Sequence, residues 1–199
     1  MGGRAGGQGL SGRPAGPGTD DGPELRTERL VLRRWRPSHL DPLAEMHADP
    51  EVMATLSAAP FLREESDRFA RHQELGFEHF GHSMWAVELA SGELIGAAGL
   101  TAVIFEAPFT PAVDVGWRLA RHHWGHGYAT EAARAAVGYG FDVLGLDEIV
   151  AFTSVGNGRS EAVMLRLGMT RDRAGDFDHP NVAVGDPLRP HILYRLRRP

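Results

Sequence analysis

Hydrophobic and polar side chains alternate along residues 112–119, with valine, tryptophan and leucine at every second position. This period of two is typical of a half-buried strand. Along residues 129–144 the apolar and small residues recur instead at spacings of three and four, which predicts a helix with a narrow face that can pack closely on a sheet. A β-rich run follows at 148–153. Strands and helices therefore alternate in this region, which indicates an α/β protein.

The same patterns predict elements on either side of this region. Two strand-like runs separated by residues 90–92 are typical of a hairpin. Ser38 and Asp41 have the spacing of a capping box, which predicts a helix that begins near Pro37. In chain order, the sequence predicts a strand at 25–35, a helical segment that begins at Pro37, a second that begins at Asp49 and a third at 64–80. A hairpin with strands at 84–89 and 93–100 follows, and the last predicted element is a strand at 191–196.

A loop with very little side chain joins the 112–119 strand to the helix that follows it. Glycine allows backbone conformations that other residues avoid, so several N–H groups can converge on one point where the helix dipole favours negative charge. The pattern predicts a phosphate site, although the glycine spacing fits neither a dinucleotide fingerprint nor a Walker loop. Its residues are Trp124, Gly125, His126, Gly127, Tyr128, Ala129 and Thr130.

A second motif follows the β-rich run. It begins at Asn157, with Ser160 three residues later, and continues as a short helix that ends in Arg-Leu-Gly-Met at residues 166–169. Asparagine is among the best residues for capping a helix N-terminus, so capping is one interpretation of Asn157. A role in ligand binding is the other.

Together the two motifs resemble those of the GNAT superfamily of N-acetyltransferases. The loop is similar to the family's acetyl-CoA signature, (Gln/Arg)-x-x-Gly-x-(Gly/Ala), with Trp124 where Gln or Arg is usual. The second motif is similar to the family's Asn-x-x-Ser/Ala element, and the order and separation of the two motifs also match. Tryptophan followed by Gly-Tyr-Ala-Thr-Glu-Ala resembles the Rim-type branch, whose members acetylate the N-termini of ribosomal proteins.

The resemblance covers nearly all of residues 25–199 and implies the fold. We expect a GNAT-like α/β architecture: a mixed, mostly antiparallel twisted sheet, splayed at a central parallel strand pair, with helices on both faces. The helical segments before the hairpin are expected to form a lid over the acceptor site. Residues 24–199 are expected to be one acetyltransferase domain. Residues 1–23 are rich in Gly and Pro and have few apolar side chains to offset the entropy of ordering, which predicts a disordered leader.

The resemblance also implies acetyl-CoA as the cosubstrate. Its pyrophosphate is expected on backbone N–H groups of the glycine loop, and its pantetheine arm along the strand that ends at Leu119, where a backbone N–H near Trp117 polarises the thioester carbonyl. Asn157 and Ser160 are expected near the pantetheine arm. The expected cofactor-binding residues are Trp117, Arg118, Leu119, Trp124, Gly125, His126, Gly127, Tyr128, Ala129, Thr130, Asn157 and Ser160.

The residues that handle protons are less well defined. Many relatives have a tyrosine on the helix after the asparagine motif, and the aligned residue here is Met164, which cannot donate a proton. That role falls to Ser160, to water or to another side chain, or is unnecessary because a thiol is acidic enough to leave as thiolate. Asn157, Ser160 and Asp114 form the predicted catalytic set, although Asp114 could simply face solvent on its strand. The candidate bases are Asp114, Glu106, His179 and His191.

Three histidines lie within residues 122–126, at His122, His123 and His126. A metal site is one interpretation, but the neighbouring glycines favour a turn over a helix that would align the rings. The sequence also places no acidic or thiol ligand beside them. We therefore expect loop histidines and no metal.

The composition of the chain limits the reactions and partners to be considered. The 199-residue chain has no cysteine, which excludes disulfides and a cysteine acyl-enzyme and favours direct transfer from the thioester to an amine in a ternary complex. The net charge of −5, with both signs interspersed, gives no indication of nucleic-acid or membrane binding. We expect a cytoplasmic protein, and a homodimer, common in such families, is an open expectation.

The predicted function is transfer of an acetyl group from acetyl-CoA to a primary amine. The sequence leaves the acceptor open between a protein or peptide N-terminal amine and a small-molecule amine. The main alternative is an acetyl-CoA-binding module without turnover, which Met164 and the lack of an evident base leave open. A non-enzymatic nucleotide-binding or interaction domain is a further alternative, which the joint spacing of the two motifs disfavours.

Overall fold

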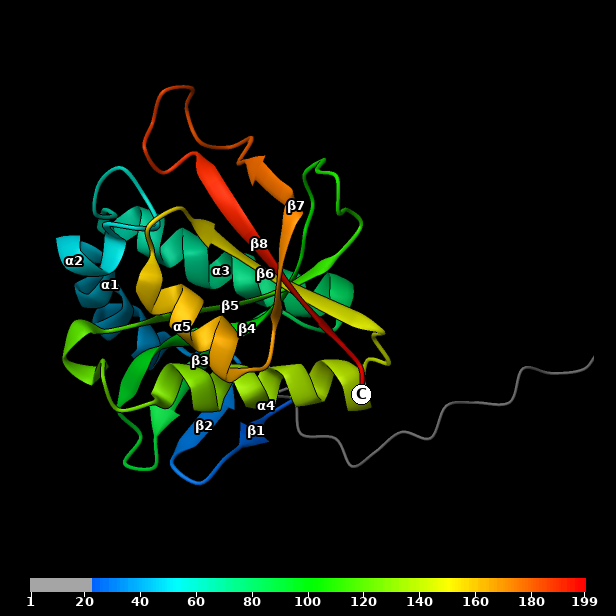
Figure 1. The fold of residues 1–199 in the computed structure, drawn as a ribbon. Helices are drawn as coiled ribbons and strands as arrows, with labels where there is room; N and C mark the ends of the chain where they lie inside the picture. The colour runs from blue at the N-terminus through cyan, green and yellow to red at the C-terminus, as the bar shows by residue number, and fades with distance from the viewer. Residues whose placement is uncertain (1–22) are drawn as a thin grey trace, which may run out of the picture.

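Eight strands form one open sheet in the order β1-β2-β3-β4-β5-β6-β8-β7 within residues 23–199, which are the residues that the computed structural model describes (Figure 1). The predicted leader therefore lies outside the described residues, apart from Pro23. The strands are β1 Leu25–Arg26, β2 Leu30–Arg33, β3 Met84–Leu89, β4 Leu94–Ala102, β5 Val113–Leu119, β6 Glu148–Ser154, β7 Thr170–Asp178 and β8 Pro190–Arg197.

Helices cover both faces of this sheet, with α3 behind the strands and α4 in front of them in Figure 1. The alternation of β3 produces the two layers: Trp85 and Val87 pack in the cluster that contains α4, whereas Met84 and Ala86 pack in the cluster that contains α1 and α2. None of the helices in the described part of the chain is long and apolar enough to cross a membrane. The helices are α1 Leu40–Ala48, α2 Pro50–Met53, α3 Arg63–Phe80, α4 Tyr128–Asp142 and α5 Gly158–Arg166.

The sheet is splayed where β5 meets β6. These two strands run parallel and pair at one position, Asp114 with Val150, whereas the neighbouring pairs between residues 23 and 199 are antiparallel. Beyond Asp114, β5 continues alongside β4 to Leu119 while β6 diverges from it. The predicted fold class, including the splayed parallel pair and the helices on both faces, is confirmed.

Two local predictions near the N-terminus are wrong. The single strand expected at 25–35 is two strands, β1 and β2, because the chain reverses between them with the Thr27 N–H donating to the Leu30 carbonyl over 3.0 Å. The expected capping box of Ser38 and Asp41 is absent from this segment. A 3₁₀ helix at Pro37–His39 begins there instead, with the Arg36 N–H donating to the His39 ring over 3.0 Å.

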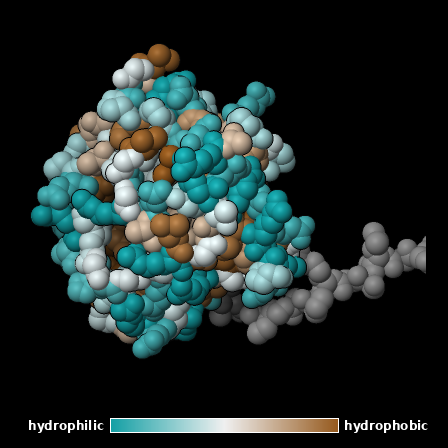
Figure 2. Space-filling view, viewed as in Figure 1, coloured by the Kyte–Doolittle hydropathy of each residue, from teal (hydrophilic) through white to brown (hydrophobic). Residues whose placement is uncertain are grey.

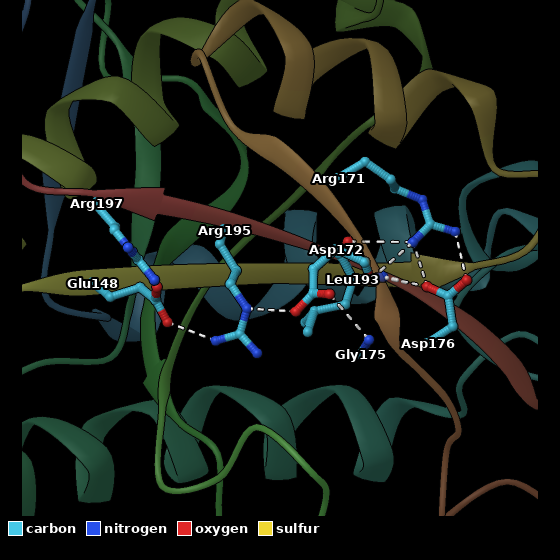
Figure 3. Close-up of polar contacts among 8 residues, drawn as sticks. All are labelled: Glu148, Arg171, Asp172, Gly175, Asp176, Leu193, Arg195 and Arg197. Atoms are coloured by element: carbon cyan, nitrogen blue, oxygen red, sulfur yellow. Dashed lines mark hydrogen bonds and ion pairs between the residues drawn. The ribbon is translucent and has the colours of Figure 1, made fainter.

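An ionic network joins the three strands at the far edge of the sheet (Figure 3). Arg195 of β8 bridges Asp172 of β7 at 2.7 Å and Glu148 of β6 at 2.6 Å. The register of β7 shifts between Asp172 and Phe177, and the shift is held by Asp172 accepting from the Gly175 N–H over 3.2 Å. Because a bulge bends its strand, this network lies where β7 bends before it pairs with β8 again at Phe177 and Asp178.

Candidate active site

A cleft of about 1760 Å³ opens between the diverging ends of β5 and β6 and extends along the first turns of α4 and α5. Figure 2 shows this face hollowed beside the start of α5, with apolar residues in the hollow and polar residues around it. The structure brings every predicted site residue into the lining of this one cleft. These are Asp114, Trp117, Arg118, Leu119, Trp124, Gly125, His126, Gly127, Tyr128, Ala129, Thr130, Asn157 and Ser160.

The glycine loop forms one end of the cleft. Gly125 and Gly127 have φ of +81° and +82°, which side-chain-bearing residues rarely adopt, and Gly127 is the N-cap of α4. A glycine N-cap has no side chain to occupy the first-turn N–H groups, and the first intrahelical bond here runs from the Glu131 N–H to the Gly127 carbonyl. The preceding N–H groups and the positive end of the helix dipole therefore fit the pyrophosphate of acetyl-CoA.

A polar network that sequence reasoning missed holds this loop against the N-terminal strands. Glu131 accepts hydrogen bonds from the Thr27 hydroxyl at 2.6 Å and from Arg29 Nε at 2.7 Å, and Arg29 Nη1 donates to the His126 carbonyl at 3.0 Å. Burial opposes ionisation of Glu131, but these bonds outweigh burial and lower its pKa. The Glu in Gly-Tyr-Ala-Thr-Glu-Ala was the available signal, although its partners lie about 100 residues earlier in the chain.

Trp124 anchors the loop to the end of β5. Its indole Nε1 donates to the Leu119 carbonyl over 2.8 Å, and the ring packs against both helical layers of the core. The Arg159 guanidinium of α5 lies 4.2 Å from the indole centroid, across the cleft. The indole therefore has a clear packing role where the family usually has Gln or Arg.

The side chain of Arg118 lies on the face of β5 that packs against α1 and α3. It donates to Nε2 of His47 on α1 at 3.0 Å and lies 4.5 Å from the Phe69 ring centroid on α3. Burial lowers the pKa of Arg118 to about 10, and burial together with Arg118 lowers the pKa of His47 to about 3. His47 is therefore neutral, with Nδ1 donating to Ser66 Oγ at 2.9 Å. Any cofactor role of Arg118 consequently rests on its backbone.

Asn157 occupies the cap position predicted for it. Its Oδ1 accepts from the Ser160 N–H at 3.2 Å, and its Nδ2 donates to Thr153 Oγ1 at 2.8 Å. The side chain thus joins the start of α5 to the end of β6. Met164, at the family's tyrosine position, is 1% exposed and belongs to the core.

Asp114 lies at the other end of the cleft, at the point where the strands part. It is half-buried, but its Oδ1 is fully enclosed and has no hydrogen-bond partner among residues 23–199. Burial raises the pKa of Asp114 to about 8, against an opposing effect of the Phe152 backbone amide. A carboxyl group that titrates near neutral pH is typical of a residue that exchanges protons with a substrate.

Two histidines line the same end. His179 follows β7 and His191 lies on β8, with ring centroids 4.9 Å apart. Their ring centroids lie 6.0 and 5.9 Å from that of Phe152, with the rings inclined to the phenyl plane. Desolvation lowers the pKa of both rings, so they are neutral at pH 7. His191 Nδ1 faces the Arg189 carbonyl at 3.1 Å, which places the proton on Nδ1 and leaves Nε2 as an acceptor. Glu106 is exposed and lies outside the cleft lining.

Only part of the helical region that was expected to form a lid over the acceptor site lines the cleft. Residues of α2 and the turn after it, including Val52 and Thr55, line the cleft, whereas α1 and α3 pack behind β5. Phe105 and Phe109 belong to the connection between β4 and β5, and their ring centroids lie 5.9 and 6.0 Å from that of Phe152. Neither residue lines the cleft. The connection therefore supports the acceptor end indirectly.

The sequence expectation for the histidine-rich segment requires one correction. An acidic residue does lie beside it, because the turn before β4 places Glu93 within 3.1 Å of His123 and 4.0 Å of His122. Neither the spacing nor the local sequence indicated this neighbour, which is separated from the histidines by the whole of β4 and β5.

Comparisons with known proteins agree with this geometry. The family model of the GNAT acetyltransferase domain matches residues 29–170. A curated relative from Aspergillus fumigatus, named FsC-acetyl coenzyme A-N(2)-transacetylase, is 34% identical over 154 residues, covering 74% of this chain and 65% of the relative. The crystal structure of an acetyltransferase from Agrobacterium tumefaciens is 30% identical, with a TM-score of 0.71 over 94% of this chain and 100% of the other.

A structure of RimL, named as the ribosomal L7/L12 α-N-protein acetyltransferase in complex with coenzyme A, shares the fold. Its TM-score is 0.70 at 19% identity, over 88% of this chain and 98% of that one. Together with the family match and the curated relatives, the fold and the cleft define an acetyl-CoA-dependent acyltransferase. The chain belongs to the GNAT acetyltransferase family.

Proposed function

We propose that this protein transfers an acetyl group directly from acetyl-CoA to a primary amine, with both substrates bound in the cleft at once. The observation that carries the proposal is the placement of the glycine loop and Asp114 at opposite ends of one cleft opened by the β5–β6 splay. Such an arrangement aligns an anion site, a strand edge and a proton acceptor along a single extended ligand.

The donor half rests on backbone groups. The N–H groups at the start of α4 would hold the pyrophosphate, and the edge of β5 beyond Asp114 would pair with the pantetheine amides. A backbone N–H near Trp117 would hydrogen-bond the thioester oxygen as it becomes negative during attack. Asn157 and Ser160 would position the start of α5 alongside the pantetheine arm.

The acceptor half depends on Asp114 as the base. Its raised pKa means that it is mostly protonated at pH 7 and ionised above about pH 8, where it can take a proton from the bound ammonium group. His191 is the competing base, because its Nε2 is an acceptor and its pKa is lowered. A base at Asp114 predicts turnover that rises through about pH 8, whereas a base at His191 predicts a rise below pH 6.5.

The acceptor itself is a primary amine with an apolar neighbour. Protonated Asp114 and two neutral histidines leave the region around Phe152 with little charge, which favours a substrate whose amine is flanked by apolar atoms. Both a peptide N-terminus and a small-molecule amine meet this description. The structure named as a ribosomal α-N-protein acetyltransferase shares the fold, which is compatible with the first of these classes.

A binding module without turnover is the second candidate, since buried Met164 offers no proton to a leaving thiolate. Calorimetric titration with acetyl-CoA, with ADP as the control, followed by thiol release against a panel of N-terminal peptides and small amines, separates the two. We expect tight acetyl-CoA binding and thiol release with one acceptor class. Binding without release across the panel would favour the module, and absence of binding would contradict both.

A further inference from the structure

We propose that Glu93, His122 and His123 form a binding site for a divalent transition-metal ion of the zinc class, outside the acetyl-transfer chemistry. One ligand atom from each residue lies within 4.8 Å of the others. The Glu93 Oε1 is 3.1 Å from Nε2 of His123 and 4.0 Å from Nε2 of His122, so both rings present the same nitrogen to one carboxylate oxygen.

These spacings fit a tetrahedral ion. With Zn–N and Zn–O bonds of about 2.1 Å, two ligand atoms on one tetrahedral ion lie about 3.4 Å apart, and the two measured distances bracket that value. Two imidazoles and one carboxylate favour zinc, nickel or copper over magnesium and calcium, which prefer oxygen ligands. Water would supply the fourth ligand, since Glu93 and His122 are exposed.

The ligands come from two rigid supports. Glu93 lies in the tight turn before β4, where its carbonyl accepts from the Leu89 N–H over 2.9 Å. His122 and His123 belong to the short 3₁₀ helix Arg121–His123, with ring centroids 4.2 Å apart, and the His123 side chain is 11% exposed. Adjustment on binding therefore falls mainly on the exposed His122 ring.

The neighbouring charge does not oppose a cation here. Arg121 points to Asp49 at 3.1 Å and to Glu51 at 3.4 Å, so its charge is paired away from the three ligands. The cluster itself carries one negative charge when both rings are neutral. Binding of a divalent ion to it leaves a net charge of +1, beside the acidic Glu45 and Asp49, which line the same pocket as Glu93 and His122.

An ion at this position would link the β3–β4 hairpin to the base of the glycine loop. His123 immediately precedes Trp124, whose indole bonds the end of β5. A ligand that binds the folded state alone raises the stability of that state by mass action. We therefore expect the ion to raise the melting temperature and to restrain the segment that leads into the loop.

The test is titration of the chelator-treated, tag-free protein with zinc chloride, followed by calorimetry and thermal melting. We expect one zinc ion per chain, and at least tenfold weaker binding in Glu93→Gln and in His122→Ala. His72→Ala, which removes an exposed histidine on α3, is the matched control and should bind as the wild type does. Cobalt in place of zinc should give the strong visible absorption of a tetrahedral site.

Unchanged affinity in both cluster variants would overturn the proposal, as would equal weakening in His72→Ala. Magnesium should produce no shift in melting temperature, and a shift equal to that from zinc would also contradict a histidine site. Acetyl-CoA affinity, measured in parallel on the chelator-treated protein, reports on the acetyltransferase function separately. Failure to bind zinc would therefore not contradict the proposed acetyltransferase function, and failure to bind acetyl-CoA would not contradict the metal site.

Discussion

The two ends of the cleft are built in different ways. The end proposed to bind the donor is one continuous segment, residues 124–130, which leads into the first turn of α4. The acceptor end is made of side chains from three strands and one loop, with Asp114 on β5, Phe152 on β6, His179 after β7 and His191 on β8. The donor end therefore depends on local backbone conformation, and the acceptor end on the tertiary fold.

This difference predicts that the two ends respond differently to mutation. At the donor end, a side chain changes binding when it alters the backbone of the loop, directly or through the contacts that hold the loop, or when it occupies the anion site. At the acceptor end, a conservative side-chain change that preserves shape can remove the chemistry. The predictions below test this contrast, from the largest expected effect to the smallest.

Gly127→Trp should abolish acetyl-CoA binding, with a loss of more than 100-fold in affinity. The substitution forces a φ of +82°, at a cost of about 1–2 kcal/mol, and places an indole beside the first-turn N–H groups. Calorimetry measures the affinity. Gly145→Trp is the matched control, because Gly145 also has positive φ (+72°), with open space around it and no place in the cleft. Equal loss in both variants would point to general destabilisation.

Asp114→Asn should lower turnover about 100-fold or more with little change in acetyl-CoA affinity, because an amide cannot accept the proton. The amine itself also titrates, so the pH profiles of wild type and variant should be compared with one acceptor. The wild-type rise through about pH 8 should be lost in the variant. Asp142→Asn, an exposed change on α4, is the control. An unchanged profile would transfer the role to His191.

The same variant has a second expected effect, on stability. The pKa of Asp114 is higher in the folded protein than its ordinary value of 3.8, so the folded state loses stability as the pH rises from about 4 through about 8. Asp114→Asn removes that loss. Thermal melts should show the variant more stable than the wild type at pH 9, by roughly 1–3 kcal/mol, and similar to it at pH 4. A variant less stable than the wild type at pH 9 would contradict a raised pKa of the buried Asp114 carboxyl group.

The family resemblance, carried by the glycine loop and the asparagine motif, predicted the fold. Two glycines, a strand of period two and a helix of period 3.6 predicted the local elements that frame the cleft, because those patterns are encoded locally. Arg29 and Glu131 show where this stops: the glutamate is visible in the motif, but its partner comes from a β-turn about 100 residues away. His47 and Glu93 were missed for the same reason, because their roles arise from neighbours that tertiary packing supplies.

Glu131→Gln should weaken acetyl-CoA binding about threefold to tenfold. It removes the charge that orients Arg29, whose Nη1 holds the His126 carbonyl of the loop. Calorimetry on Glu131→Gln, Arg29→Ala and the double variant should give non-additive losses, since both single changes break one network. Strictly additive losses would mean that the two residues act on the loop independently.

Asn157→Ala should reduce turnover a few-fold and cost about 1 kcal/mol of stability through loss of the α5 cap. Asn157→Ser separates capping from ligand binding, because a serine can cap the helix but cannot reach Thr153 and the pantetheine arm in the same way. We expect the stability to recover in Asn157→Ser while turnover stays low. Full recovery of both would restrict Asn157 to capping.

Met164→Leu should have the smallest effect, with turnover within about twofold of wild type and a stability change below about 1.5 kcal/mol. Met164 is 1% exposed and packs in the core beneath α5, so a side chain of similar volume preserves the wall of the cleft. Met164→Tyr sharpens the comparison by restoring the family's usual residue at this position. If thiolate departure limits turnover, the tyrosine variant will be faster than wild type; equal rates in a folded protein would mean that the thiol leaves unassisted.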